Sequence, residues 1–173
     1  MDRSQATDEN SRAEDRPREV YIRPMASADI SSVMRIERAC FSTPWSEKIF
    51  VTELQHNDHA DYIVAASGDE LLGYAGQWLH RYEAHVTNIA VTPAHRGRRI
   101  GARLLLSLMH RALLKGIGRM TLEVRASNTM AMAFYKRYGF SVRGIRHNYY
   151  TDTREDAVVM ACTAVAEVLD RRQ

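Results

Sequence analysis

Two side chains in the sequence have the chemistry of a proton acceptor and a proton donor. Glu123 lies in the otherwise apolar run Leu122-Glu123-Val124, where a carboxylate is costly unless it faces a cleft or a partner. Tyr135 lies about two helical turns after Asn128, and a tyrosine hydroxyl with a pKa near 10 can donate a proton. The residues alone leave other roles open: a salt bridge to Arg125 or a solvent-facing position for Glu123, and core packing for Tyr135.

A basic turn that contains glycine is the second chemical feature. It follows the apolar run Asn88-Ile89-Ala90-Val91 and Pro93, and it opens an apolar helix. Backbone N–H groups at a helix N-terminus are unsatisfied and carry the positive end of the helix dipole, so such a turn suits a pyrophosphate. A helix start is weak evidence alone, because every helix has one. The turn and the first helical residues are Arg96, Gly97, Arg98, Arg99, Ile100, Gly101, Ala102 and Arg103.

The periodicity of apolar residues predicts an alternation of strands and helices around these groups. Strands are expected at 21–24, 62–66, 71–79, 85–91, 120–124, 140–145 and 156–162, with an antiparallel meander in the middle. Helices are expected at 28–40 with Ser27 as N-cap, at 46–55 with Ser46 as N-cap, from the glycine turn to Gly116 or Gly118, and at 129–138. The segment 164–172 is a short terminal helix or a frayed end.

Length and composition predict one folded domain. The chain has 173 residues with 45% hydrophobic content, enough for one sizeable core. Residues 1–20 hold six acids and four arginines with almost no large aliphatic side chain, so we expect a disordered charged tail. The domain is then 21–163, followed by an extension at 164–173. Without an apolar signal region or a membrane-length run, we expect a cytoplasmic protein that does not bind membranes.

Charge favours an anionic ligand without pointing to nucleic acid. Outside the first twenty residues, 20 Lys or Arg face 15 Asp or Glu. No nucleic-acid motif accompanies this excess, so we expect no nucleic-acid partner. Cys40 and Cys162 fit two reduced thiols. His56 and His59 have a spacing seen in metal sites but no third ligand, so no metal is expected.

Five motifs follow one another along the chain: Phe41-x-x-Pro44-Trp45-Ser46, Asn88-Ile89-Ala90-Val91, Leu122-Glu123-Val124-Arg125-Ala126-Ser127-Asn128, Asn148-Tyr149-Tyr150 and Arg154-Glu155-Asp156-Ala157. In this order they resemble the GCN5-related N-acetyltransferase (GNAT) family, and within it the RimI-type ribosomal-protein-alanine N-acetyltransferases. The likeness covers about Tyr21 to Cys162 and implies an α/β (α+β) fold. The expected fold is a mixed, mostly antiparallel sheet of about seven strands with about four helices, splayed at an acetyl-CoA site.

The resemblance implies a role for each chemical group. Glu123 becomes the proton acceptor, and Tyr135 becomes the donor to the coenzyme A thiolate. The backbone of Ile89, Ala90 and Val91 is expected to hold the pantetheine arm and the thioester oxygen. Asn128 is expected to bond the same arm, although the residue alone predicts only a helix N-cap. The pyrophosphate is expected to lie on the turn, at Arg96, Gly97, Arg98, Arg99, Ile100, Gly101 and Ala102.

The turn departs from the family pattern at one position. Arg99 stands where the first of two glycines belongs, and a side chain there restricts φ and can crowd a phosphate. Because Gly97 and Gly101 remain, we expect cofactor binding to survive with a shifted backbone. Arg99 could instead add a charged contact to the cofactor.

The resemblance also implies an acceptor groove between the Pro44-Trp45 loop and the Asn148-Tyr149-Tyr150 hairpin. Trp45, Tyr149 and Tyr150 are expected to line it, with Glu83 as a possible acidic contact. The three aromatic residues are equally consistent with hydrophobic lids over the ends of the sheet.

The implied function is transfer of acetyl from acetyl-CoA to the N-terminal alanine of the eighteenth small-subunit ribosomal protein, by a monomer or weak dimer. The alternative enzyme acetylates lysine or small amines with the same groups. An alternative of another class is a non-catalytic acyl-CoA sensor, which the presence of both Glu123 and Tyr135 argues against. An α-amine has a pKa near 8 and a lysine near 10.4, so reaching the neutral amine at pH 7 costs about 1.4 and about 4.6 kcal/mol respectively.

Overall fold

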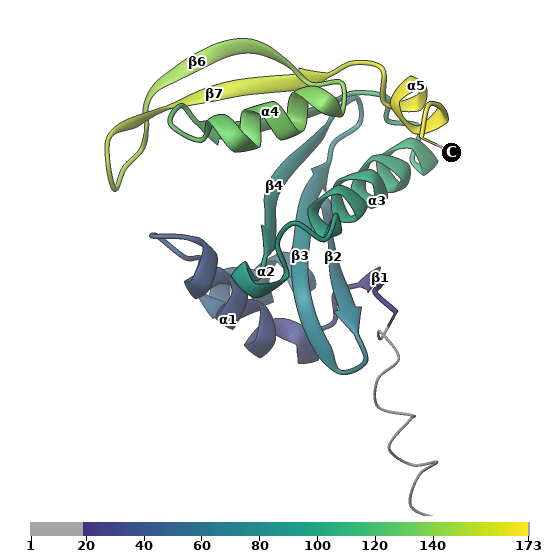
Figure 1. Cartoon of the computed structure of the whole chain (residues 1–173), viewed down its shortest axis with the longest axis vertical. Coiled ribbons are helices and arrows are strands. Elements are labelled where there is room, and N and C mark those ends of the chain that lie inside the picture. Colours follow the sequence, from purple (N-terminus) through teal and green to yellow (C-terminus); the bar gives the residue numbers. More distant parts are fainter. Residues whose placement is uncertain (1–18, 173) are drawn as a thin grey trace, which may run out of the picture.

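A seven-stranded sheet organises residues 19–172, the part of the chain that the computed structural model describes (Figure 1). The strand order is β1-β2-β3-β4-β5-β7-β6, and every neighbouring pair is antiparallel except β4 and β5. The elements are β1 Tyr21–Pro24, η1 Ser27–Asp29, α1 Ile30–Cys40, α2 Glu47–His56, β2 Ala60–Ser67, β3 Glu70–Leu79, β4 Ala84–Val91, η2 Pro93–His95, α3 Ile100–Leu114, β5 Met120–Arg125, α4 Thr129–Arg137, β6 Ser141–Tyr150, β7 Glu155–Cys162 and α5 Val165–Asp170.

Helices cover both faces of the sheet, and strand alternation divides the core accordingly. On β2, Ile63 and Ala65 pack into the cluster that contains α3, whereas Tyr62 and Val64 pack into the cluster that contains α1 and α2. Leu104 and its neighbours on α3 are fully buried, and each such side chain contributes about 1.5–3 kcal/mol. The two clusters fix the sheet between its helical layers.

The parallel strands β4 and β5 separate soon after they meet. Their register contains only two pairs, Ala84 with Met120 and His85 with Thr121. Next to this point the β3–β4 register shifts, because Gly76 pairs with Asn88 whereas Gln77 pairs with Val86. A bulge of this kind bends its strand and increases the local twist, so it turns β4 away from β5. The sheet therefore opens into a wedge at its centre.

The predicted fold class is confirmed, and the ends of some elements differ from the prediction. Ser27 as the N-cap of helix 28–40 is wrong: the chain enters α1 through the 3-10 turn η1. The carboxylate of Asp29 accepts the Ala26 N–H at 2.8 Å and pairs with Arg23 at 2.6 Å. A carboxylate held by a guanidinium accepts more strongly than a serine hydroxyl, which explains the outcome.

The C-terminal part of the sheet is longer than predicted. The strand expected at 140–145 is β6, which continues to Tyr150 across two register shifts. The expected Asn148-Tyr149-Tyr150 hairpin is therefore the end of a strand, and the turn to β7 lies at 151–154. The extension at 164–173 contains α5, whose Val165 is buried in the core next to α3. Of the predicted tail, residues 1–18 lie outside the described residues.

A buried carboxylate fixes the loop between α1 and α2. Glu37 is 1% exposed, its Oε2 accepts the Trp45 N–H at 3.0 Å, and its Oε1 accepts the Tyr74 hydroxyl. Burial raises the pKa of Glu37 to about 7, although the Trp45 N–H partly opposes this shift. The Trp45 loop therefore depends on a group that titrates near neutral pH.

This burial makes the stability of the protein depend on pH. The folded state binds a proton on Glu37 up to about pH 7, whereas an unfolded glutamate releases it near 4.5, so this component of stability falls as pH rises between these values. We expect the wild-type free energy of unfolding to lose about 2–3 kcal/mol from this source between pH 5 and 8. Urea unfolding of Glu37→Gln should lack this loss, whereas Glu47→Gln, at an exposed position on α2, should keep it. Parallel pH profiles for wild type and Glu37→Gln would contradict the assignment.

Candidate active site

A cleft of about 900 Å³ lies beside the end of β4, beyond the two positions at which β4 pairs with β5. It is bordered by β4, the start of α3 and one side of α4. All the predicted cofactor residues line it except Arg98. The cleft also takes in residues that the sequence did not single out. The lining residues are Cys40, Phe41, Ile89, Ala90, Val91, His95, Arg96, Gly97, Arg99, Ile100, Gly101, Ala102, Asn128, Met130, Ala131, Phe134, Tyr135, Arg137, Tyr138 and Arg172.

The start of α3 has the geometry of an anion site. The N-cap of α3 is Arg99, whose side chain makes no capping hydrogen bond. The first backbone N–H groups of the helix therefore receive no hydrogen bond from the N-cap side chain. A Cβ built on Gly101 meets nothing closer than Val91 Cγ2 at 3.8 Å, so the helix start is open at this position. Arg96 lies beside the cleft and donates to the Val91 carbonyl at 3.3 Å. Unsatisfied N–H groups together with arginines fit a pyrophosphate.

Arg99 adopts the left-handed conformation that glycine favours, with φ 60° and ψ 12°. A residue with a side chain pays about 1–2 kcal/mol in this region. The position therefore keeps the backbone that a glycine would adopt, and it places an arginine on the wall of the cleft.

Glu123 faces away from the α3 core, on the same side of the sheet as α1 and α2. Its side chain is 7% exposed and makes two ionic contacts, with His85 Nε2 at 3.0 Å and Arg146 Nη1 at 3.3 Å. Burial acts to raise the pKa of Glu123, but the His85 hydrogen bond and the charges of His85 and Arg146 outweigh it and lower that pKa. The alternative of a bridge between Glu123 and Arg125 is not what the structure shows, because Arg125 pairs with Asp152 at 2.7 Å and with Glu155 at 3.2 Å.

Tyr135 combines the two roles that the sequence left open. Its ring packs against Phe134 and Phe140, with centroids 5.2 and 5.6 Å away, and it also lines the cleft. Burial raises the pKa of the Tyr135 hydroxyl, which therefore stays protonated at neutral pH. Within the described residues this hydroxyl has no hydrogen-bond partner, so its proton is available to a group in the cleft.

Asn128 is the N-cap of α4. Its Oδ1 accepts the Ala131 N–H at 3.0 Å, as the residue alone predicted. The side chain also lines the cleft. With the oxygen engaged in capping, the amide N–H₂ is the group that can bind a ligand there.

The two loops expected to border the acceptor are tied to each other. In the β6–β7 turn, Asp152 accepts hydrogen bonds from Ser42 at 3.0 Å and Thr43 at 3.3 Å in the α1–α2 loop. Arg125 holds the same carboxylate at 2.7 Å and lies 4.0 Å from the centre of the Tyr150 ring. We call this group of Ser42, Thr43, Arg125 and Asp152 the loop clasp; Figure 1 shows the two segments approaching each other.

The predicted acceptor residues occupy different environments around the clasp. Trp45 packs its ring on Phe50 with centroids 5.6 Å apart, so much of it belongs to the core. Tyr149 is 43% exposed and stacks edge-on with Tyr150 at 5.2 Å.

Glu83 lies before β4, where its carboxylate is engaged by neighbours. It pairs with Arg119 at 2.5 Å and accepts the Thr121 hydroxyl at 2.8 Å. Partial burial acts to raise the pKa of Glu83, but the hydrogen bonds from Arg119 and Thr121 prevail and lower it. This carboxylate is connected with Glu123 through Thr121 and His85, a link that the sequence did not reveal.

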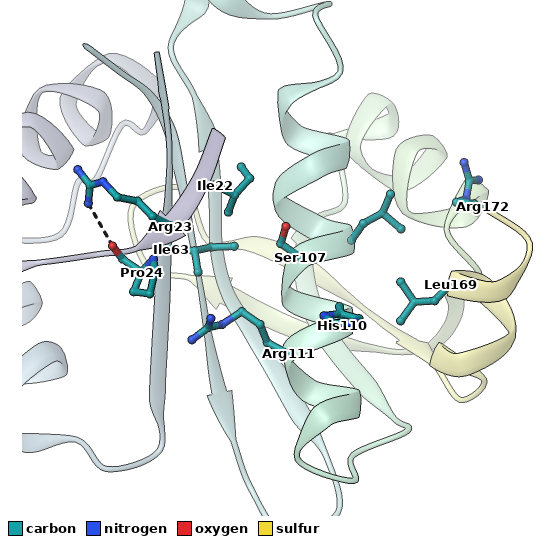
Figure 2. A pocket seen from close by; sticks show the side chains of 10 residues that line it. Ile22, Arg23, Pro24, Ile63, Ser107, His110, Arg111, Leu169 and Arg172 are labelled. Atoms are coloured by element: carbon teal, nitrogen blue, oxygen red, sulfur yellow. Dashed lines mark hydrogen bonds between the residues drawn. The ribbon is translucent and has the colours of Figure 1, made fainter. Parts of the chain in front are cut away.

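A second cavity, of about 420 Å³, lies between β1, α3 and α5 (Figure 2). Its charged residues are largely committed: Arg23 pairs with Asp29 at 2.6 Å, and Arg111 pairs with Asp61. Ile22 and Leu169 contribute apolar walls. The cavity brings together no acid–base pair, and the cleft at the wedge is the better candidate for chemistry.

The cleft fits coenzyme A. The open wedge exposes backbone of β4 for amide contacts, the start of α3 presents N–H groups to phosphates, and the volume suits a large cofactor. Among residues 19–172, no group of three or more His, Cys, Asp and Glu side chains is placed to hold a metal ion. No helix in the same part of the chain has the length and apolar character needed to cross a membrane.

Comparison with known proteins finds similarity across most of the chain. The model of the acetyltransferase (GNAT) family matches residues 30–140. A putative ribosomal protein bS18-alanine N-acetyltransferase of Bacillus subtilis is 41% identical over 82% of this chain and 94% of that protein. The ribosomal protein bS18-alanine N-acetyltransferase of Escherichia coli K12 is 35% identical over 81% and 95%. The crystal structure of the ribosomal-protein-S18-alanine N-acetyltransferase from Escherichia coli superposes with a TM-score of 0.77 at 33% identity, covering 83% of this chain and 93% of that one.

The strained arginine in the turn gives a prediction with two readouts. Arg99→Gly removes the left-handed strain, so the free energy of unfolding should rise by about 0.5–1 kcal/mol in urea titrations. It also removes a charge from the cleft wall, so acetyl-CoA affinity measured by calorimetry should fall about 3- to 10-fold.

Arg98→Ala serves as the control, because Arg98 neighbours the turn but does not line the cleft. Its affinity should stay within about twofold of wild type. A tighter complex with Arg99→Gly would show that the arginine obstructs the cofactor instead.

Proposed function

The chain belongs to the acetyltransferase (GNAT) family and is an acetyl-CoA-dependent N-acetyltransferase, and we propose that its acceptor is the N-terminal amine of a protein. The alanine at the N-terminus of ribosomal protein bS18 is the proposed substrate, as the names of the relatives from Bacillus subtilis and Escherichia coli indicate. A ribosomal acceptor agrees with the predicted cytoplasmic location. The predicted monomer or weak dimer stays a prediction.

The observation that carries this proposal is the buried carboxylate of Glu123 next to the opening of the sheet. Acetyl transfer needs a group that takes a proton from the amine, and Glu123 is 7% exposed on β5 where β4 turns away. The amine nitrogen attacks the thioester carbon, the nitrogen loses its proton to Glu123, and the carbon–sulfur bond breaks. The Tyr135 hydroxyl gives its proton to the departing thiolate. Backbone N–H groups of β4 polarise the carbonyl.

The loop clasp supports a chain end as the acceptor. The hydrogen bonds between Asp152 and Ser42 and Thr43 join the loops that border the expected path to Glu123. A protein N-terminus needs room for only one strand of polypeptide between the joined loops. An internal lysine needs more room, because its chain continues in both directions. The loop clasp therefore favours a protein N-terminus over a lysine side chain as the acceptor.

Removal of the Tyr135 hydroxyl tests the proposed acid. In Tyr135→Phe the ring still packs on Phe140, so the protein should stay folded and its acetyl-CoA affinity should stay within about twofold of wild type. The kcat should fall about 100-fold or more, because the proton donor is lost. Tyr138→Phe is the matched control, because Tyr138 also lines the cleft and packs on Phe134. Its kcat should stay within about threefold. Equal rates for Tyr135→Phe and wild type would remove Tyr135 from the proton transfer.

The acceptor is tested with peptides that copy the alanine-first N-terminus of the proposed ribosomal protein. Mass spectrometry should show acetylation of the free-amine peptide and none of a twin with a blocked α-amine and a free lysine. Acetylation of the blocked twin at an equal rate would favour the lysine alternative. Bound acetyl-CoA with no product from either peptide would favour the non-catalytic sensor or a small amine.

A further inference from the structure

His85 is the residue of β4 that lies beside Glu123 at the last pairing position before the strands separate. Its Nε2 is 3.0 Å from Glu123 Oε2, and its Nδ1 is 3.1 Å from the Thr121 hydroxyl. The ring also stands 6.0 Å from the Trp78 ring, which limits its rotation. Both nitrogens of the imidazole are therefore engaged on β5.

The hydrogen-bond chain determines which nitrogen carries the hydrogen. Glu83 has a lowered pKa and is ionised at neutral pH, so its carboxylate can only accept. Thr121 has one hydroxyl hydrogen and gives it to Glu83 Oε1 at 2.8 Å. The Thr121 oxygen must then accept from His85, so Nδ1 carries a hydrogen in every charge state of the ring.

With the hydrogen on Nδ1, the Nε2 atom that faces the Glu123 carboxylate is bare in the neutral ring and carries a hydrogen only when the ring is protonated. A bare Nε2 lone pair and a carboxylate oxygen repel each other at 3.0 Å, whereas one proton between them makes a strong hydrogen bond. The pair therefore has two states, one with a shared proton and one without it. Such closely coupled groups titrate as a unit, so the proton belongs to the pair and not to either residue.

We propose that His85 is a positioning residue that makes Glu123 an effective base, with Thr121 and Glu83 setting its tautomer. The inference rests on the proposed function. In the state without the shared proton, the pair accepts the proton of the bound α-ammonium group: the N–H bond breaks, its electrons stay on the amine nitrogen, and the proton comes to rest between Glu123 Oε2 and His85 Nε2. The pair passes this proton to solvent, and the neutral amine then attacks the thioester carbon. As the amide forms, the nitrogen loses its second proton to the pair, the carbon–sulfur bond breaks with its electrons on sulfur, and the Tyr135 hydroxyl protonates that sulfur.

Other charged or titratable groups surround the pair. Arg146 of β6 contacts Glu123 Oε1 at 3.3 Å, and its side chain is 58% exposed. Tyr150 at the end of β6 lies close enough to interact electrostatically with Glu123. Arg119 acts on His85 only through Glu83. Of the two ionic partners of Glu123, Arg146 keeps its charge, whereas the imidazole of His85 has two nitrogens that can each carry a hydrogen.

The tautomer is measured without any acceptor. Two-bond ¹H–¹⁵N spectra of the histidine rings at pH 8 should show the His85 signal with hydrogen on Nδ1 and a bare Nε2, the signal being assigned by its loss in His85→Gln. In Thr121→Val the signal should change to a mixture of tautomers. An Nε2–H tautomer in wild type would overturn the inference. Because no substrate is present, this result stands apart from the fate of the proposed acceptor.

The contribution to rate is measured with His85→Gln, whose amide can still donate to Glu123 but does not titrate. We expect kcat for the alanine-first peptide to fall about 10- to 100-fold, with the KM for acetyl-CoA within about twofold. The acid limb of the kcat profile should move to lower pH by at least about one unit, because Glu123 without its partner holds a proton less tightly than the proton-sharing pair of Glu123 and His85 does. A residue that only packs would leave that limb in place.

His110→Gln is the matched control, because His110 lies on α3 beside the second cavity. Its profile should coincide with that of wild type. A His85→Gln profile that coincides as well, with kcat within threefold, would overturn the inference. If wild type acetylates no α-amine peptide, the proposed acceptor fails, and the tautomer measurement still decides the assignment of His85.

Discussion

The separation of β4 from β5 is the constraint on which the rest of the site depends. A flat, fully paired sheet would satisfy the N–H and C=O groups of β4 within the sheet and leave no cofactor cleft. The bulge opposite Gly76 and Gln77 turns β4 just after His85, so the last paired position holds a histidine and the next residues are open. The same bend places the end of β4 beside the turn that starts α3. One local irregularity thus creates the wedge, the backbone contacts and the anion site together.

The polar face of β5 shows how the fold tolerates charge at this opening. Strand alternation sends Met120, Leu122 and Val124 into the core with α3, and it sends Thr121, Glu123 and Arg125 to the other side. Each of these three is matched by a neighbour on a different element. A buried carboxylate without such partners would cost several kcal/mol or become protonated. The partners of Glu123 therefore stabilise the folded protein and also determine the proton affinity of the Glu123 carboxylate.

The sequence predicted the parts of the site that depend on short motifs. The turn 96–101, the strand with Glu123 and the helix with Tyr135 are local patterns. The turn and Tyr135 line one cleft, whereas Glu123 is not among the residues that line it. Features that depend on register escaped prediction. His85 looked like an ordinary strand residue, because only the two-residue pairing of β4 with β5 places it beside Glu123. The ends of β6 and the entry into α1 were misplaced for the same reason, and the partners of Glu83 were not foreseen: long-range hydrogen bonds determine these features.

The electrostatics of Glu123 bears on the choice of acceptor. A carboxylate whose pKa is lowered is a weak base, and it is better matched to an α-amine near 8 than to a lysine near 10.4. The difference between the two amines at pH 7 is about 3 kcal/mol, which a lysine enzyme must supply with a stronger base or a desolvated pocket. Here the partners of Glu123 stabilise its charge against the effect of burial, so any gain in proton affinity comes from the proton that the carboxylate shares with His85. The network around β5 is therefore suited to a substrate that gives up its proton easily, which is the property that distinguishes a protein N-terminus.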